Sequence, residues 1–239
     1  MKLFIFDLDN TLTKSKEPID DEMALMIAKL LEMHKMALVS GSTFKQIKIQ
    51  FLSRIPPNTC LSNLFLIPQS GSTLLAFVNN KWKVLYNKKL APGDKRLIRK
   101  AFGKNSNRLE DKDGEMTFSA LGKHAPLIKK KKWDPKDTKR NILVHDLLPK
   151  LPGFEVKIGG TTSIDVTKQG INKGYGVRKL LNFLSIPKAN AVFFGDALFP
   201  GGNDYSVLMA GIKSVKVKNP QDTKREILSI IEANEPKNS

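Results

Sequence analysis

Two aspartates stand two residues apart near the N-terminus, in the run Phe6-Asp7-Leu8-Asp9-Asn10-Thr11-Leu12-Thr13. They follow a short apolar run, residues 2–6, that is typical of a buried parallel strand. Because ligands bind at the carboxyl ends of strands in open parallel sheets, both carboxylates can turn towards one site. Asp7 is the candidate nucleophile, and Asp9 is the candidate acid and base that protonates a leaving oxygen and later deprotonates water. The alternative is an ordinary aspartate-rich loop.

Two further features are suited to holding a phosphoryl group. Ser40-Gly41-Ser42 follows a second apolar run and precedes an expected helix, where Gly41 and Ser42 are candidates for binding phosphate oxygens through N–H and hydroxyl groups. Lys173 stands at the start of a later expected helix, and its ammonium could neutralise a phosphate beside a carboxylate nucleophile. The plainer alternatives are a common turn tripeptide and one more solvated lysine.

A second acidic pair lies towards the C-terminus. Asp196 ends an apolar run, residues 191–194, and a glycine-rich loop brings Asn203-Asp204 back towards it. Acidic residues on a tight loop suit a six-coordinate Mg²⁺ ion, with waters and a phosphate oxygen completing the shell. Asn203 is also a good N-cap for the helix that follows, so a purely structural role for it stays open.

The elements that must position these residues alternate between strand and helix, which predicts a parallel sheet with helical crossovers. From about residue 74 the pattern changes to antiparallel strands and short helices, with a hairpin turn at Asn79-Asn80 and a helix start at Asp134-Pro135. The alternation resumes near residue 172. We therefore expect an α/β core at residues 1–79 and 172–239 with an inserted α+β cap at residues 80–171.

Charge and composition limit the function classes. The chain has 40 Lys and Arg residues against 23 Asp and Glu, a formal net charge of +17, which predicts anionic partners. The lysines are spread along the chain apart from the run Lys129–Lys132, and this favours a solvated lysine-rich surface over a nucleic-acid footprint. The single cysteine, Cys60, excludes an internal disulfide. No stretch approaches the ~20 apolar residues of a membrane span, so we expect no membrane partner. Asp7 and Asp9 interrupt the apolar N-terminal run where a secretory leader would stay apolar, so we expect a cytoplasmic protein.

Taken in chain order, one at each strand end, these features resemble the four motifs of the haloacid dehalogenase superfamily. Asp7-x-Asp9-x-Thr11 is similar to the first motif, Ser40 to the second, Lys173 to the third, and Gly195-Asp196…Asn203-Asp204 to the fourth. Thr11 is therefore a further substrate-binding candidate. The resemblance implies a Rossmann-like core with a C2-type cap, the larger α/β cap class of that superfamily.

The resemblance also implies how a metal is held. Mg²⁺ is expected to bridge Asp7, the backbone carbonyl of Asp9, Asp196 and the phosphate, with Asp204 beside it. Ser40 and Lys173 are expected to balance the charge of the transferring group, which is the main catalytic contribution in phosphoryl transfer.

A narrower resemblance is to phosphomannomutases of the eukaryotic type. It lies in the long spacing of Gly195-Asp196-x-x-x-Pro200-Gly201-Gly202-Asn203-Asp204 and in Gly159-Gly160-x-x-Ser163-x-Asp165-Val166, followed by Gly170-x-x-Lys173. In that family the corresponding serine and aspartate contact the sugar, which makes Ser163 and Asp165 substrate candidates. A polar pair on a strand face is the alternative.

This chain departs from the family in its cap. Where the mutases hold the distal phosphate with arginines, lysines stand here, at Lys112, Lys123 and Lys130, with Lys16 near the first motif. Arginine binds phosphate as a bidentate fork, whereas lysine is a flexible point charge, so a bisphosphate intermediate is held less firmly. These four lysines are substrate-binding candidates, with a solvated surface position as the alternative.

The leading hypothesis is a Mg²⁺-dependent phosphohydrolase that acts on a small phosphorylated sugar through a phosphoaspartate. A phosphomannomutase-type sugar phosphate mutase is the first alternative, and a non-catalytic basic nucleic-acid-binding protein is the second. The full set of acidic residues argues against the nucleic-acid reading, because a binding module has no need of converging carboxylates beside a phosphate. A homodimer stays open.

Overall fold

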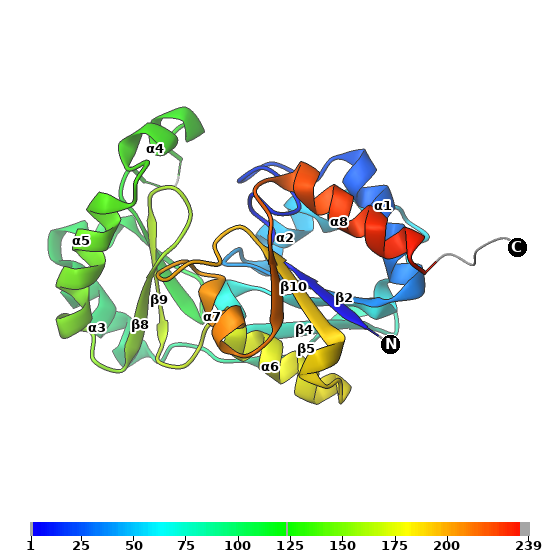
Figure 1. The fold of residues 1–239 in the computed structure, drawn as a ribbon. Helices are drawn as coiled ribbons and strands as arrows, with labels where there is room; N and C mark the ends of the chain where they lie inside the picture. The colour runs from blue at the N-terminus through cyan, green and yellow to red at the C-terminus, as the bar shows by residue number, and fades with distance from the viewer. Residues whose placement is uncertain (1, 123, 235–239) are drawn as a thin grey trace, which may run out of the picture.

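The computed structural model describes residues 2–122 and 124–234 and consists of two sheets with their helices (Figure 1). Within that part of the chain, the larger sheet has the strand order β11-β10-β1-β2-β3-β4-β5. Strand β4 pairs antiparallel with both β3 and β5, and the remaining neighbouring strands pair parallel. Its strands are β1 (Leu3–Phe6), β2 (Lys35–Val39), β3 (Leu64–Ile67), β4 (Thr73–Val78), β5 (Lys81–Asn87), β10 (Ala191–Gly195) and β11 (Lys213–Lys216).

Helices cover both faces of the larger sheet, which explains why its strands are apolar on both sides. Along β1, Phe4 and Phe6 point into one hydrophobic core, while Leu3 and Ile5 point into another on the opposite face. Helices α1, α2 and α8 pack on the first face, and α6 and α7 pack on the second. These helices are α1 (Asp21–Met33), α2 (Phe44–Gln50), α6 (Lys173–Leu184), α7 (Tyr205–Met209) and α8 (Pro220–Glu232).

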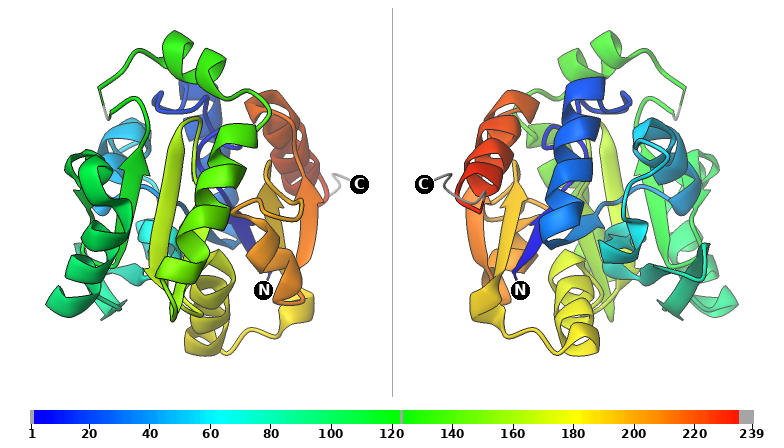
Figure 2. Two further views of the ribbon diagram at one scale, coloured as in Figure 1. Left: turned by 90° about the vertical axis from the view of Figure 1, so that its left-hand side faces the viewer. Right: turned by 90° about the vertical axis from the view of Figure 1, so that its right-hand side faces the viewer.

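The smaller sheet is antiparallel, with the order β6-β7-β9-β8, and forms the cap. On β7, Met116 and Phe118 point towards the cap helices, so the alternate residues Glu115, Thr117 and Ser119 lie on the opposite face. Figure 2 shows two helices, at residues 92–102 and 138–147, on the outer side of this sheet, while the helix at residues 127–133 lies above its end. The cap elements are α3 (Pro92–Phe102), β6 (Leu109–Asp111), β7 (Glu115–Ser119), α4 (Leu127–Trp133), α5 (Thr138–Leu147), β8 (Phe154–Ile158) and β9 (Ser163–Lys168).

Short 3₁₀ helices occur in the connections. They are η1 (Leu52–Arg54), η2 (Leu61–Asn63), η3 (Gln69–Gly71), η4 (Gly103–Arg108), η5 (Leu148–Lys150) and η6 (Lys188–Asn190). Within the described residues, no helix combines the length and apolar character that crossing a bilayer requires.

The hairpin expected at Asn79-Asn80 is present, with φ values of 52° and 58° that suit asparagine in a tight two-residue turn. Its second strand, β5, pairs with β4 at the edge of the larger sheet, although the expected cap range of 80–171 includes it. The sequence pattern detects a hairpin but not the sheet to which it is added. We therefore propose that the cap begins after β5, near residue 88.

The helix start expected at Asp134-Pro135 is wrong in position. Helix α5 begins at Thr138, and the lysine run lies on a separate helix, α4, that ends at Trp133. The Asp134 carboxylate still caps α5, because it accepts hydrogen bonds from the backbone N–H groups of Lys139 and Arg140, each at 3.0 Å. The intervening turn lets Asp134 also pair with the side chain of Arg140 at 3.0 Å.

Candidate active site

Three neighbouring parallel strands bring the expected motifs to one edge of the larger sheet. Strand β1 lies between β2 and β10, with Phe6 in register with Leu38 and Phe194. Because the next residues along each strand leave the sheet at the same level, Asp7 is flanked by the Ser40 loop and the Asp196 loop.

Lys173, the first residue of α6, forms two ion pairs at the centre of this edge. Its Nζ lies 2.6 Å from Asp7 Oδ1 and 2.7 Å from Asp204 Oδ1, and all three side chains are buried. Burial opposes the charge on Lys173, but Asp204 and Asp7 more than offset it and raise its pKa. Asn172 fixes the start of α6 by accepting the N–H of Tyr175 at 3.0 Å.

Asp7, Asp196 and Asp204 form an acidic cluster in which one oxygen from each lies within 4.8 Å of the others. Burial raises the pKa of Asp7 well above its ordinary value, and Asp204 and Asp196 raise it further against the opposing charge of Lys173. Burial and the Asp204 carboxylate likewise raise the pKa of Asp196. Three carboxylates facing one ammonium leave an excess of negative charge, so an oxygen-only set of this kind fits a hard cation such as Mg²⁺.

Asp9 lies across the cavity from the cap and is held by Lys16. Its Oδ1 accepts the backbone N–H of Lys16 at 2.7 Å, and its Oδ2 accepts Nζ of the same residue at 3.0 Å. Asn10 and Lys16 adopt positive φ values of 62° and 67°, which fold the loop back on itself. The amide of Asn10 reaches Asp196 Oδ2 at 3.2 Å, so this loop also steadies the metal candidate.

The Ser40 loop lines the cavity, whereas Thr11 lies beneath it. Ser40 Oγ accepts the N–H of Ser42 at 3.1 Å, and Ser42 Oγ is buried with no partner among the described residues. Gly41 also lines the cavity. Thr11 is fully buried and is not among the lining residues. Its hydroxyl is buried with no partner among the described residues, and its carbonyl accepts the hydroxyl of Thr223 at 2.7 Å, which ties the loop to α8. Substrate binding by Thr11 stays a prediction.

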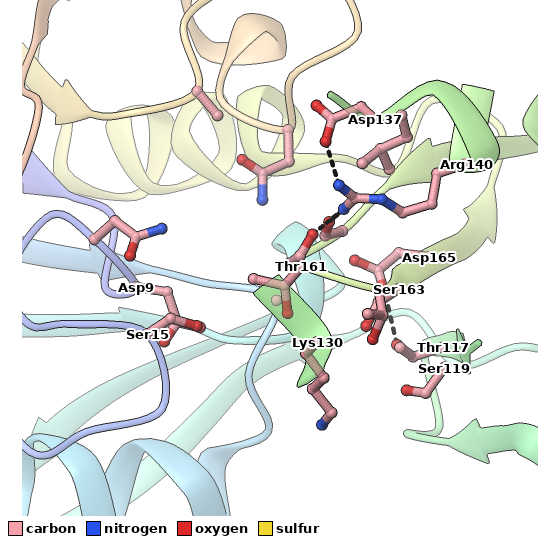
Figure 3. Close-up of a pocket in the computed structure, with 18 of the residues that line it drawn as sticks. Asp9, Ser15, Thr117, Ser119, Lys130, Asp137, Arg140, Thr161, Ser163 and Asp165 are labelled. Atoms are coloured by element: carbon pink, nitrogen blue, oxygen red, sulfur yellow. Dashed lines mark hydrogen bonds and ion pairs between the residues drawn. The ribbon is translucent and has the colours of Figure 1, made fainter. Parts of the chain in front are cut away.

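A cavity of about 770 Å³ separates this edge of the core from the cap. Figure 3 shows Asp9 on the core side facing Ser163, Asp165 and Lys130 on the cap side. Asp165 Oδ1 accepts the hydroxyl of Thr117 at 2.7 Å. Burial and the neighbouring Glu115 carboxylate raise the pKa of Asp165 to about 6.

The expected cap lysines are placed differently from one another. Lys130 lines the cavity, and burial together with nearby Lys16 lowers its pKa, so a cation from the cap and one from the core face the same space. Lys112 also lines the cavity, but its ammonium bonds Glu115 Oε1 and the carbonyl of Gly41, each at 2.9 Å. Lys123 lies outside the described residues.

Several residues of the site escaped the sequence analysis, foremost Arg140. It is buried, lines the cavity, and donates to the carbonyls of Gly159 and Gly160 and to Asp134 and Asp137 (Figure 3). Arg140 therefore fixes the turn that leads into β9 and its polar face. The available signal in the sequence was that Asp137 and Asp134 precede Arg140 by three and six residues. Such spacing is common on solvent-exposed helices, so it did not indicate a buried arginine.

Glu115, Thr117 and Asn10 were missed as well. Glu115 and Thr117 occupy alternate positions of β7, which is the spacing of one strand face. That pattern predicts a shared face but not that the face borders a cavity, and nothing in the sequence near Asn10 indicates Asp196 as its partner.

Comparisons with known proteins agree with this geometry. A family model described as eukaryotic phosphomannomutase matches residues 100–233. A probable phosphomannomutase from Caenorhabditis elegans is 26% identical over 249 aligned residues, covering 96% of this chain and 95% of the relative. Phosphomannomutase 1 from Dictyostelium discoideum is 28% identical over 242 aligned residues, covering 92% of each.

Among solved structures, an N-terminally truncated, IMP-bound IMP-nucleotidase from Plasmodium falciparum superposes with a TM-score of 0.68 at 17% identity, covering 97% of this chain and 68% of that one. A Streptococcus mutans protein gives a TM-score of 0.68 at 15% identity and covers 98% of both chains. At these identities the likeness shows the fold alone, a haloacid dehalogenase-type core with an inserted cap.

Proposed function

Since this chain belongs to the eukaryotic phosphomannomutase family, and is thus a phosphotransferase or phosphatase of the haloacid dehalogenase type, we propose that it hydrolyses a small phosphorylated sugar through a phosphoaspartate on Asp7. The observation that carries this proposal is the buried pairing of Lys173 with Asp7 and Asp204, in which Asp7, like neighbouring Asp196, lines the cavity between core and cap. The proposed nucleophile Asp7, the cation Lys173 that pairs with it and the proposed metal site therefore lie next to one another.

In the first step an oxygen of Asp7 attacks phosphorus and the bond from phosphorus to the sugar oxygen breaks. Lys173 is paired with Oδ1, so we assign the attack to Oδ2. Asp9 gives its proton to the leaving oxygen, which departs as a sugar hydroxyl. Ser40, Gly41 and Ser42 line the cavity beside Asp7 and supply hydroxyl and N–H groups to the phosphoryl oxygens.

In the second step Asp9, now ionised, takes a proton from water. The water oxygen bonds to phosphorus, the bond from phosphorus to Asp7 breaks, and inorganic phosphate leaves with the Asp7 carboxylate restored. Lys16 holds both oxygens of Asp9 through its own backbone and ammonium groups, which keeps the carboxylate aimed across the cavity.

Asp7, Asp196 and Asp204, with the backbone carbonyl of Asp9, would hold Mg²⁺. When bound, the ion supplies positive charge that offsets the charge accumulating on the phosphoryl oxygens. The excess negative charge of the acidic cluster supports this assignment.

Hydrolysis is favoured over mutase activity by what the cap offers. A mutase must hold a bisphosphate while it turns over, yet the Lys112 ammonium is occupied by Glu115 and the Gly41 carbonyl. The Lys16 ammonium is likewise bound to Asp9, and Arg140 donates to Asp134, Asp137 and the carbonyl of Gly159. Lys130 faces the cavity as a point charge, without the bidentate geometry of arginine. Mutase activity is the second candidate, and it is favoured by the relatives, which are named phosphomannomutases.

The test is a panel of hexose monophosphates with Mg²⁺, scored in parallel for released phosphate and for isomerised sugar phosphate. We expect released phosphate to exceed isomerised product even when a hexose bisphosphate activator is present. Efficient isomerisation with little phosphate release would reverse the ranking of the two activities. Turnover of none of the panel would reject a sugar phosphate substrate.

A further inference from the structure

We propose that Glu115 is a positioning residue that joins the cap to two loops of the core site, the Ser40 loop, which is to bind phosphate, and the loop that carries Asp204. This inference rests on the proposed function, because it says how a residue of the specificity cap reaches the groups around Asp7. Glu115 opens β7, is fully buried, and lies on the face of the cap sheet that borders the core.

The first connection runs through Lys112 to the Ser40 loop. Lys112 Nζ lies 2.9 Å from Glu115 Oε1 and 2.9 Å from the carbonyl oxygen of Gly41. The pair therefore bridges the cap to the loop that is to bind the transferring phosphate. Burial opposes the charge on Lys112, but the Glu115 carboxylate more than offsets it and raises its pKa. Because its ammonium is bound to these two oxygens, Lys112 has a structural role and is not available to bind an anion.

The turn that carries Lys112 is itself seated on the core. The Gln69 side chain donates to the carbonyl of Lys112, and Gly114 lies so close to Ser72 that an added Cβ would be 2.3 Å from its Oγ. Lys112 is thus fixed at both its backbone and its ammonium, and a displacement of the cap would be transmitted to Gly41.

The second connection runs through a second, small cavity of about 20 Å³. Within the described part of the chain, Glu115 Oε2 and Asn203 Oδ1 are buried without a hydrogen-bond partner, and both residues line this cavity together with Lys173. A space of this size holds one water. Two acceptor atoms match the two O–H groups of a water, so we place a bridging water between Glu115 and the loop that carries Asp204.

Thr117 links Glu115 to the sugar-binding face. Its Oγ1 lies 3.1 Å from Glu115 Oε1 and 2.7 Å from Asp165 Oδ1, so one hydroxyl proton is shared between two carboxylates. A contact of Asp165 with a sugar hydroxyl would therefore change the hydrogen bonding of Glu115. Glu115 thereby connects the sugar subsite to both loops.

The experiment compares Glu115→Gln and Lys112→Met with Asp94→Asn, which removes a cap ion pair to Lys168 that borders neither cavity. Two substrates are used: the best hexose phosphate of the panel, and 4-nitrophenyl phosphate, which offers the cap no sugar to recognise. Both substrates use the Ser40 loop and the loop that carries Asp204, so we expect kcat to fall for both in the two variants. The fall should be about tenfold for the hexose phosphate, with KM within about twofold, and smaller, about threefold, for the aryl phosphate, which makes no sugar contact with Asp165.

Hydrogen exchange provides a readout that is independent of the substrate. In Glu115→Gln and Lys112→Met, peptides covering residues 40–42 and 200–204 should exchange faster, whereas β8 and β9 keep their protection. Asp94→Asn should match the wild-type protein in both assays. Unchanged kcat and unchanged loop exchange in the two variants would overturn the inference. Loss of protection throughout the cap in both variants would overturn it too, since that would show a merely structural role.

The two proposals fail in different ways. If the wild-type protein turns over no hexose phosphate but the variants still loosen both loops, the proposed substrate is wrong and the positioning role of Glu115 stands. If hexose phosphate is hydrolysed and the variants behave as the wild-type protein, the proposed function stands and the role of Glu115 is wrong.

Discussion

At the scale of single residues, the site is defined by one buried ammonium that faces three carboxylates. Lys173 pairs with Asp7 and Asp204, and Asp196 adds a further carboxylate that pairs with no ammonium in the described part of the chain. A buried ion pair adds little stability by itself because desolvation offsets much of its Coulomb energy. The arrangement is therefore better explained by chemistry than by stability, as perturbed pKa values clustered in a cleft indicate.

Asp7→Asn should abolish turnover while leaving the fold intact. An amide does not attack phosphorus and supplies no charge to a cation, whereas its size matches the carboxylate. We expect kcat below about a hundredth of the wild-type value, measured by phosphate release. Circular dichroism serves as the control for folding. A folded variant with more activity than that would show that another residue is the nucleophile.

Asp165→Asn should change the pH dependence of stability in a defined direction. The raised pKa of Asp165, about 6 against an ordinary 3.8, means that the folded state holds a proton that the unfolded state loses. Asp165 therefore lowers the free energy of unfolding as pH rises from about 4 to about 6. The variant removes this loss, so its stability relative to wild type should increase across that range in urea unfolding experiments.

Asp94→Asn is the matched control, because Lys168 lowers the pKa of Asp94. Its contribution has the opposite sign: it stabilises above the ordinary pKa and is lost as pH falls. Parallel pH trends in the two variants would contradict the environment assigned to Asp165.

At the scale of elements, the position of Lys173 is set by the contact between α6 and α7. Gly174 follows Lys173 on the first turn of α6, and a Cβ at Gly174 would lie 2.1 Å from the backbone oxygen of Ser206 in α7. Asp204 directly precedes α7. One close helix contact thus holds both partners of the ion pair, and glycine is required there for space.

Gly174→Ala should therefore impair both stability and catalysis. Backbone cannot yield as a flexible side chain does, so α6 must shift away from α7 and carry Lys173 with it. We expect a loss of about 1–3 kcal/mol in the free energy of unfolding and at least a roughly tenfold lower kcat. Gly93→Ala on α3 is the control, because the nearest atom to its Cβ, from Arg96, is 3.8 Å away. An active, stable Gly174→Ala variant would refute this account.

At the scale of the whole molecule, the candidate site lies between the core and the cap, which are formed by different segments of the chain. The core contributes the acidic cluster, and the cap contributes Lys130, Ser163 and Asp165 across a cavity of about 770 Å³. The net charge of +17 favours anionic substrates without specifying them. If the proposed function is correct, we expect substrate specificity to come from the polar face of the cap sheet, which borders the cavity.

Mg²⁺ should stabilise the whole fold and be required for activity. A ligand that binds only the folded state at about 100 times its Kd adds roughly 2.7 kcal/mol, measurable as a higher Tm. Asp196→Asn should lose most of that shift. Ca²⁺ prefers longer bonds and more ligands, so it should bind but inhibit. Full activity in EDTA would exclude the metal site.

Much of the fold was predictable because periodicity and strand ends are local properties. Apolar runs bounded by Asp7, Ser40 and Asp196 predicted the parallel sheet, and Asn79-Asn80 predicted the β4–β5 hairpin. The sheet to which β5 is added and the late start of α5 were not predictable, because both depend on partners distant in the chain or on a turn that the Asp134–Arg140 pair stabilises.

For the site, the residue types and their order by themselves determined the core candidates, since three motifs at strand ends and one at a helix start leave few arrangements. Only the tertiary structure decided which contacts the cap lysines make. Lys112 and Lys130 are equivalent as sequence, yet one is bound to Glu115 and Gly41 while the other faces the cavity beside Lys16. The physical reason is that a long, flexible ammonium pairs with whichever acceptor the fold brings within reach, and a one-dimensional pattern does not contain that distance.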